Sequence, residues 1–285
     1  MHSNKTAFVT GSSRGIGKAA AMALAEAGFD IIISARTVKA GDSHHSIPVP
    51  GSLEETAAEI KALGREVLLV PMDLTSFDSI NNAWNQVIEQ WGRVDVLVNN
   101  AVYQGGGTTD LVEDLTQDNA ETLFRGNVIS PLILTQNAVA HMRENGRGGR
   151  IINMVSESAT KTPVLPVNNG GWSFAYAASK AAIERLVPML KVELKEDNIK
   201  VFNCEPGFIF TEFMKEKGMD ESYARQYGGA PVTVPAKVIA WLATSDEAAE
   251  EFHGTLCSAQ RTALKKQLHP DWRPEKKKKP ETAAV

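Results

Sequence analysis

The chain has 285 residues, of which 43% are hydrophobic and 22% are charged, and its formal net charge is −4. This composition is typical of a folded globular protein with one or two domains, and the acidic balance argues against nucleic acid as the main partner. The two cysteines, Cys204 and Cys257, have no metal-site spacing around them, and no apolar run is long enough to span a membrane. We therefore expect a reduced, cytoplasmic protein with no metal and no membrane partner.

Short apolar runs alternate with longer runs of helical periodicity along the whole chain. The strand-like runs are Ala7–Thr10, Asp30–Ser34, Glu66–Pro71, Val94–Asn99, Arg150–Val155, Lys200–Cys204 and Gly254–Ser258. The helix-like runs are Gly15–Ala27, Leu53–Leu63, Asp78–Trp91, Asp118–Arg143, Ser173–Lys195 and Pro235–Thr244. This alternation predicts an α/β fold, a Rossmann-type doubly wound parallel sheet of about seven strands with helices on both faces. We expect a single domain over residues 1–259 and a C-terminal tail over residues 260–285.

A glycine-rich turn, Gly11-Ser-Ser-Arg-Gly15-Ile-Gly17, joins the first strand to the first helix. Glycine allows a sharp bend and a close approach of the backbone to a pyrophosphate, and the start of the helix supplies free N–H groups with a partial positive charge. The spacing differs from the Gly-x-Gly-x-x-Gly fingerprint and also from a P-loop, which needs a hydroxyl where Ala19 stands. We predict a phosphate cradle; a glycine turn without a ligand is the alternative.

Two arginines are expected near the ribose of a bound dinucleotide. The second strand ends with Ser34-Ala35-Arg36, where no acidic residue is present, and Arg14 lies in the glycine turn. A carboxylate at this strand end would bind a ribose 2′-hydroxyl, whereas a guanidinium pairs with a 2′-phosphate. The sequence therefore favours NADP(H) over NAD(H). The alternative is that both arginines are solvated surface residues.

Tyr176 and Lys180 are four residues apart in a helix-like run and should share one face of the helix. A positive charge within a few ångströms of a phenol lowers its pKa from about 10 by roughly 1 to 3 units. A phenol tuned in this way exchanges protons with an alcohol or a carbonyl near neutral pH. Taken alone, the pair also suits a helix whose tyrosine packs and whose lysine is solvated.

Seven motifs in register make the chain similar to the short-chain dehydrogenase/reductase family, from about residue 5 to residue 258. They are Thr10–Gly17, Asp73-Leu74, Asn99-Asn100-Ala101, Asn127, Ser156, Tyr176-Ala-Ala-Ser-Lys180 and Pro206-Gly207. The resemblance implies four catalytic residues. Ser156 would hydrogen-bond the substrate oxygen and Tyr176 would be the acid/base, while Lys180 would hold the nicotinamide ribose and Asn127 would anchor a water leading to solvent. Taken alone, Ser156 also suits a strand-end cap, and Asn127 an ordinary helix amide.

The resemblance also implies a set of cofactor contacts. Asp73 would meet the adenine amino group, Asn99 would steady the central sheet, and Thr211 would border the nicotinamide together with Pro206-Gly207. The residues expected to bind NADP(H) are Gly11, Ser13, Arg14, Gly15, Ile16, Gly17, Arg36, Asp73, Leu74, Asn100, Ala101, Tyr176, Lys180, Pro206, Gly207, Ile209 and Thr211.

The function implied is hydride transfer between the nicotinamide and a small-molecule carbonyl or secondary alcohol, with NADP(H) as cofactor. Two alternatives stay open: a catalytically silent NADP(H)-binding regulatory protein, and an isomerase or dehydratase on the same fold. The family resemblance further implies a homodimer or homotetramer assembled through the helices Asp118–Arg143 and Ser173–Lys195.

Four features depart from the family pattern or extend it. Val102 stands where the family usually has glycine, and extra chain at Thr37–Gly51 carries His44-His45, which suits plain surface residues better than a metal site. The long stretch between Ser156 and Tyr176 is expected to form one wall of the substrate pocket. Phe208–Val232, rich in aromatics and methionines, is expected to be a lid over an apolar substrate, with a satellite core or an oligomer contact as the alternative.

Overall fold

The computed structural model describes residues 2–42, 49–216 and 218–274, and a seven-stranded sheet runs through it. The strand order is β3-β2-β1-β4-β5-β6-β9, and every neighbouring pair is parallel. The bounds are β1 Thr6–Thr10, β2 Asp30–Ala35, β3 Val67–Pro71, β4 Val96–Asn99, β5 Gly149–Met154, β6 Ile199–Glu205 and β9 Leu256–Ser258. β1 and β2 are buried along almost their whole length and apolar in their middle, as expected of parallel strands covered on both faces.

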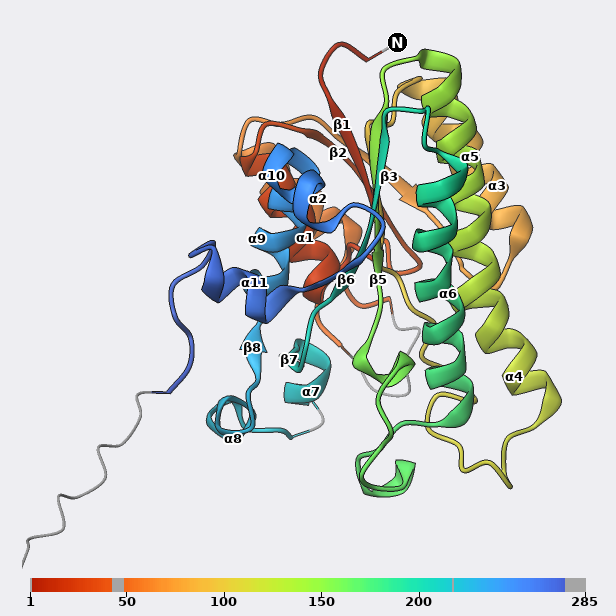
Figure 1. Cartoon of the computed structure of the whole chain (residues 1–285), viewed down its shortest axis with the longest axis vertical. Coiled ribbons are helices and arrows are strands. Elements are labelled where there is room, and N and C mark those ends of the chain that lie inside the picture. Colours follow the sequence, from red (N-terminus) through yellow and green to blue (C-terminus); the bar gives the residue numbers. More distant parts are fainter. Residues whose placement is uncertain (1, 43–48, 217, 275–285) are drawn as a thin grey trace, which may run out of the picture.

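Helices cover both faces of this sheet (Figure 1). The apolar core on one face includes residues of α1, α2, α9 and α11, and the core on the other includes residues of α3, α5 and α6. The bounds are α1 Gly15–Glu26, α2 Leu53–Ala62, α3 Phe77–Gln90, α4 Gln117–Phe124, α5 Ser130–Asn145, α6 Phe174–Glu193, α9 Thr233–Thr244, α10 Asp246–Phe252 and α11 Ala259–Lys265. The predicted fold class is confirmed.

Several helices begin where a hydroxyl side chain can cap them. Ser52, Ser76, Thr116 and Ser173 each accept a hydrogen bond from the backbone N–H three residues later, at the starts of α2, α3, α4 and α6. Such a cap satisfies one of the backbone donors that a helix start leaves without an intrahelical partner. α1 is different, because its N-cap residue, Arg14, makes no side-chain capping bond.

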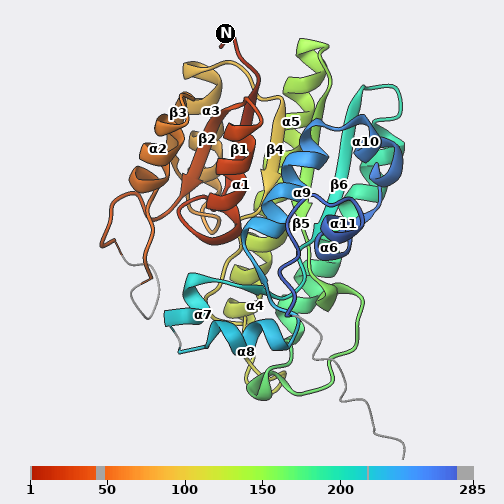
Figure 2. The same cartoon turned by 90° about the vertical axis from the view of Figure 1, so that its left-hand side faces the viewer.

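The direction in which strands are added reverses between β1 and β4, which are neighbours in the sheet. In open α/β sheets the crevice beyond the carboxyl ends of the strands at such a point is where ligands bind. Beyond these ends lies a small extra layer formed by β7 Ile209–Phe210, α7 Glu212–Glu216, α8 Glu221–Gln226 and β8 Ala230–Pro231. Figure 2 shows α7 and α8 below the sheet.

The single long helix expected over Asp118–Arg143 is wrong in its continuity. α4 and α5 are separated by a π-helical turn, η1 Arg125–Ile129, which contains Asn127. A π-turn inserts one extra residue into the helix and is found mostly at functional sites. The insertion does not change the apolar periodicity on either side enough to be read from sequence. The short η2 Glu157–Ala159 and η3 Val167–Asn169 were also not expected.

The chain does not leave the domain at residue 260. α11 follows β9 directly, Ala263 is fully buried in the core beside α9, and Trp272 is 7% exposed. The apolar side chains after Ser258 therefore continue the domain beyond the expected boundary. The lysine run at 276–279 lies outside the described residues. Across the described residues, no helix combines the length and the apolar character needed to cross a membrane.

Candidate active site

A cavity of about 1430 Å³ opens at the carboxyl ends of the strands. Every sequence-predicted site residue except Asn127 contributes to its lining. Residues that are up to two hundred positions apart in the chain are thus brought to one space, because all of them follow the carboxyl ends of parallel strands or lie on α6. Their individual roles stay predictions.

The glycine turn is shaped by its own backbone as much as by any ligand. A Cβ on Gly17 would lie 2.1 Å from the carbonyl oxygen of Gly11, so no side chain fits there. Gly11 has a φ of +71°, and its Cβ would lie 2.9 Å from Cα of Ala101. Gly15 is the glycine of this turn with free space above it, since its nearest neighbour, an oxygen of Glu212, is 3.9 Å away. An anion could therefore approach the start of α1 over Gly15.

Arg14 and Arg36 differ in their surroundings. Arg14 donates to the backbone oxygens of Pro50 and Gly51, each at 2.9 Å, and so holds the chain that leads into α2. Burial lowers the pKa of Arg14, and the charge of Arg36 acts in the same direction. Arg36 lines the cavity and makes no hydrogen bond or ion pair with any residue in the described part of the chain. Arg14 therefore positions a turn while it also lines the cavity, and the expectation that both guanidiniums serve one phosphate stays a prediction.

Tyr176, Ser156 and Lys180 lie together, as the sequence predicts. The Ser156 side chain lies close enough to the Tyr176 phenol to lower its pKa as a hydrogen-bond partner. Lys180 Nζ lies 5.9 Å from the centroid of the Tyr176 ring and donates to the backbone oxygen of Met154 at 3.0 Å. Ser156 also accepts the N–H of Ser158 and so caps η2, while its role in catalysis stays a prediction.

The expected lowering of the Tyr176 pKa is wrong for this structure. Burial of the phenol raises its pKa, and the hydrogen bond with Ser156 opposes this only in part. Lys180 is itself fully enclosed, and burial lowers its pKa to about 8. Its ammonium is directed at Met154 and not at the phenol oxygen. The sequence gives the four-residue spacing, but the degree of enclosure decides the direction of the shift.

Asn127 lies behind the cavity wall in the π-turn η1. Its Oδ1 accepts the backbone N–H of Tyr103 at 2.7 Å, and its Nδ2 lies 3.5 Å from Oγ of Ser179. Ser179 in turn donates to the backbone oxygen of Tyr176. Asn127 therefore connects the loop after β4 to the helix that carries Tyr176. A water route from Lys180 past Asn127 stays a prediction.

Asparagines on three neighbouring strands support the floor of the cavity. Asn99, Asn153 and Asn203 are register partners on β4, β5 and β6. Asn99 Nδ2 donates to Asn153 at 2.9 Å and to Thr135 of α5 at 3.0 Å, which fits the steadying role expected of Asn99. Asp73 accepts two hydrogen bonds from Thr75 and so stabilises the turn after β3 while it lines the cavity.

The two stretches expected to form walls of the substrate pocket line the cavity with only some of their residues. Between Ser156 and Tyr176, Glu157 and Trp172 line the cavity, whereas Val164 is 96% exposed. In the segment from Phe208 to Val232, the side chains of Phe208, Phe213, Met214 and Met219 line the cavity. The ends of this segment, at Ile209 and Ala230, belong to the apolar core. The side chain of Tyr223 and the pair His44-His45 lie outside the described residues.

The carboxylates of the cavity that were not anticipated include Glu205 and Glu212. Glu205 ends β6, and its Oε1 accepts the N–H of Gly207 at 2.5 Å, which fixes the Pro206-Gly207 turn. Glu212 begins α7 above the glycine turn. Glu205 directly precedes the Pro206-Gly207 motif, so its place in the cavity could have been predicted from the sequence. No local signal places Glu212 near Gly15, because the two residues are far apart in sequence.

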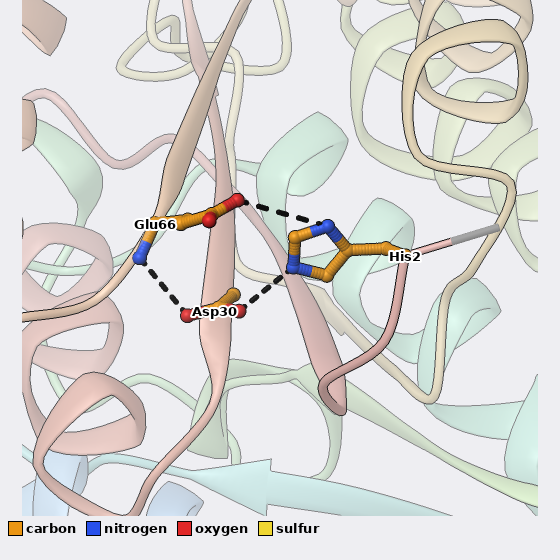
Figure 3. A group of neighbouring side chains, drawn as sticks. All are labelled: His2, Asp30 and Glu66. Atoms are coloured by element: carbon orange, nitrogen blue, oxygen red, sulfur yellow. Dashed lines mark hydrogen bonds and ion pairs between the residues drawn. The ribbon is translucent and has the colours of Figure 1, made fainter.

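A second polar cluster lies at the amino ends of the strands, where His2, Asp30 and Glu66 are neighbours (Figure 3). Oδ2 of Asp30 accepts hydrogen bonds from His2 at 2.7 Å and from Asn4 at 2.8 Å, while Oδ1 accepts the N–H of Glu66. The guanidinium of Arg65 lies 3.7 Å from the same carboxylate. Both carboxylate oxygens of Asp30 already accept hydrogen bonds, and the nearby positive charge of Arg65 disfavours a metal ion at this place. The cluster fastens the segment before β1 to the sheet.

Comparison with known families gives a match over most of the chain. Residues 5–222 match the family model of the short chain dehydrogenases. The matched range contains the glycine turn, the Asn99-Asn100-Ala101 motif, Ser156, and the Tyr176 and Lys180 pair.

Individual relatives and a solved structure cover similar lengths. A sorbitol dehydrogenase of Cereibacter sphaeroides is 31% identical over 222 residues, which cover 77% of this chain and 75% of that protein. NADPH-dependent aldehyde reductase 1 of Arabidopsis thaliana is 28% identical over 237 residues, covering 81% and 76%. The crystal structure of acetoin dehydrogenase from Enterobacter cloacae superposes with a TM-score of 0.73 at 29% identity, covering 95% of this chain and 100% of that one.

Proposed function

The chain belongs to the short-chain dehydrogenase/reductase family and is an oxidoreductase of alcohol or carbonyl substrates, and on this premise we propose that it is an NADP(H)-dependent carbonyl reductase or alcohol dehydrogenase. The observation that carries the proposal is the convergence of Ser156, Tyr176 and Lys180 on the cavity that the glycine turn and Arg36 also line. We propose Asn127, Ser156, Tyr176 and Lys180 as the functional residues of this site.

The residues of the cavity fit a pyridine dinucleotide. The start of α1 has no capping side chain and no acidic residue in its first turn, and the nearest atom to the place of a Cβ on Gly15 is 3.9 Å away, which suits a pyrophosphate once the Glu212 side chain moves. Arg36, without a partner in the described part of the chain, suits a 2′-phosphate at the end of β2. A relative named for its NADPH dependence is consistent with this assignment.

The bound nicotinamide supplies or accepts the hydride, and the protein positions the substrate and handles the proton. Ser156 and Tyr176 would donate hydrogen bonds to the substrate oxygen, where negative charge grows during reduction. Burial raises the pKa of Tyr176, so the phenol carries its proton at neutral pH, as an ordinary phenol also does. Lys180 would bind the ribose with the ammonium that now contacts Met154.

The test is to mix purified protein with NADPH or NADH and a panel of ketones and aldehydes, and to follow the nicotinamide absorbance. Oxidation of NADPH with at least one carbonyl supports the proposal. Tight cofactor binding with no turnover of any carbonyl would instead favour a regulatory protein. Chemical change of a substrate while the bound cofactor is not consumed would favour an isomerase or dehydratase.

The choice of cofactor has its own test. Replacing Arg36 by Ala should weaken NADPH binding by about 10- to 100-fold and NADH binding by less than about threefold, since a hydrogen-bonded charge contact contributes roughly 1.5–3 kcal/mol. Lys39→Ala, at an exposed lysine three residues further on, is the matched control. Equal losses for both cofactors would show that Arg36 does not read a 2′-phosphate.

We also propose a cytoplasmic homodimer or homotetramer. Met189 and Val192 on α6 are 41% and 73% exposed, which supports an apolar contact along this helix. Size-exclusion chromatography with light scattering would measure the mass in solution, and a monomer at micromolar concentration would contradict this part.

A further inference from the structure

The amino terminus of α1 faces the cavity without an anion from its own helix. Its N-cap residue, Arg14, makes no capping hydrogen bond, and the first turn contains no acidic side chain. An α-helix leaves its first N–H groups without intrahelical partners and carries a partial positive charge at that end. The start of α1 therefore attracts any anion that can reach it over Gly15.

A carboxylate from a distant part of the chain already lies there. Oε2 of Glu212, the first residue of α7, is 3.9 Å from the position that a Cβ on Gly15 would take. This oxygen is buried and has no hydrogen-bond partner in the described part of the chain. Burial lowers the pKa of Arg14, and the negative charge of Glu212 opposes that effect more than any other group does. Glu212 thus lies at the helix end and interacts electrostatically with Arg14.

The position of Glu212 needs a compensating attraction. A buried carboxylate oxygen without a hydrogen bond is unfavourable, and a five-residue helix such as α7 is too short to be stable through its own hydrogen bonds. The positive end of α1 and the charge of Arg14 are the attractions available to it. Both are also what a phosphate group would use.

We propose that Glu212 competes with the phosphate groups of the dinucleotide for the amino terminus of α1, so that cofactor binding displaces α7 from the position it has here. This inference rests on the proposed function, because it requires a dinucleotide in this cavity. Like charges in contact repel each other, so the carboxylate and a pyrophosphate do not occupy the same helix end. Phe213 and Met214 follow Glu212 directly and line the cavity, so that its displacement also reshapes the space left for substrate.

The experiment compares dinucleotide affinity in three forms of the full chain. Glu212→Gln keeps the size of the side chain and removes its charge, and Glu216→Gln removes an exposed charge from the same helix as a matched control. Titration with NADPH and with NADH, followed by calorimetry, should show about tenfold tighter binding of both to Glu212→Gln. Glu216→Gln should bind them within about twofold of the wild type.

Hydrogen exchange of the α7 amides gives a readout that does not depend on turnover. Exchange in residues 212–216 of the wild type should rise when NADPH is added, and Glu212→Gln should show the faster exchange before any addition. The inference would be overturned if the wild type binds a dinucleotide but Glu212→Gln binds it no more tightly, or if Glu216→Gln gains as much affinity as Glu212→Gln. Either result would leave the proposed function intact. If none of the three forms binds a dinucleotide, both the inference and the proposed function fail.

Discussion

The two ends of the central sheet use polar side chains in opposite ways. At the amino ends, Asp30 and Asp95 each accept hydrogen bonds from side chains and from a neighbouring strand's backbone. At the carboxyl ends, Thr108 Oγ1 and Glu212 Oε2 are buried in the cavity wall without hydrogen-bond partners among the described residues, and Lys180 is enclosed with its pKa lowered to about 8. Figure 1 shows α7 far from the end of the molecule at which β1 begins.

This difference separates stability from function within one fold. A buried polar group that is fully paired stabilises the folded chain, whereas a buried charge without a counter-charge destabilises it. The amino ends hold the strands in place through paired groups. The carboxyl ends keep groups whose best partners are not supplied by the chain itself, which is the arrangement expected of a binding and catalytic site. Substitutions at the two ends should therefore affect different measurements.

The largest expected effect is on turnover, at the carboxyl ends. Tyr176→Phe removes the proposed proton donor and should lower the rate of carbonyl reduction by about 10²- to 10⁴-fold, the usual contribution of general acid catalysis. NADPH affinity should stay within about threefold, because the ring and Lys180 are retained. Steady-state kinetics and calorimetric titration measure the two quantities. Undiminished turnover would remove Tyr176 from its proposed role.

At the amino ends, Asp30→Asn should act on stability alone. The variant keeps the shape but removes a charge that accepts from His2 and Asn4, so the free energy of unfolding should fall by about 1–3 kcal/mol at pH 7. NADPH affinity per folded molecule should not change. Glu66→Gln is the matched control, because this side chain is 72% exposed and lies 3.8 Å from His2; its effect should be below about 0.5 kcal/mol.

The difference in the free energy of unfolding between the wild type and Asp30→Asn should depend on pH. Burial raises the pKa of this carboxyl, but the hydrogen bonds from His2, Asn4 and the Glu66 backbone outweigh it and hold the pKa below its ordinary value. The unfolded state therefore binds a proton more readily than the folded state, and the contribution is complete above the unfolded pKa of about 4 and is lost in stronger acid. Denaturant unfolding at pH 7 and at pH 3 measures this. A difference between wild type and Asp30→Asn that did not shrink at pH 3 would contradict it.

A change at Lys180 should shift stability in the opposite direction. Lys180→Met should stabilise the protein without bound cofactor by about 2 kcal/mol at pH 7. Lowering the lysine pKa from about 10.4 in the unfolded chain to about 8 in the folded chain costs roughly 3 kcal/mol, which the variant avoids. The variant also loses the hydrogen bond to Met154, which offsets part of this gain. Between pH 8 and pH 10.4 the unfolded state binds the proton more strongly, so wild-type stability rises with pH and the gain should fade. Exposed Lys195→Met is the control. A loss of stability at pH 7 would contradict the proposed unfavourable burial.

Some of this arrangement could be predicted from local sequence. The alternation of apolar runs determined the parallel sheet, and the strand-end motifs placed the proposed cofactor residues outside α6 near the carboxyl edge, because parallel strands bring their ends together. The four-residue spacing of Tyr176 and Lys180 placed both on one face of α6. These features depend on backbone geometry and periodicity, which a sequence carries directly.

Other features were decided only by the tertiary structure. Arg14 holds the backbone at Pro50 and Gly51, Glu212 lies over Gly15, and His2 meets Asp30, each across a long stretch of sequence whose path no local pattern specifies. The raised pKa of Tyr176 likewise follows from how completely the folded chain encloses the phenol. Spacing along the chain determines which side chains can share a face, but burial and long-range partners determine their charge, and both arise only when distant segments pack together.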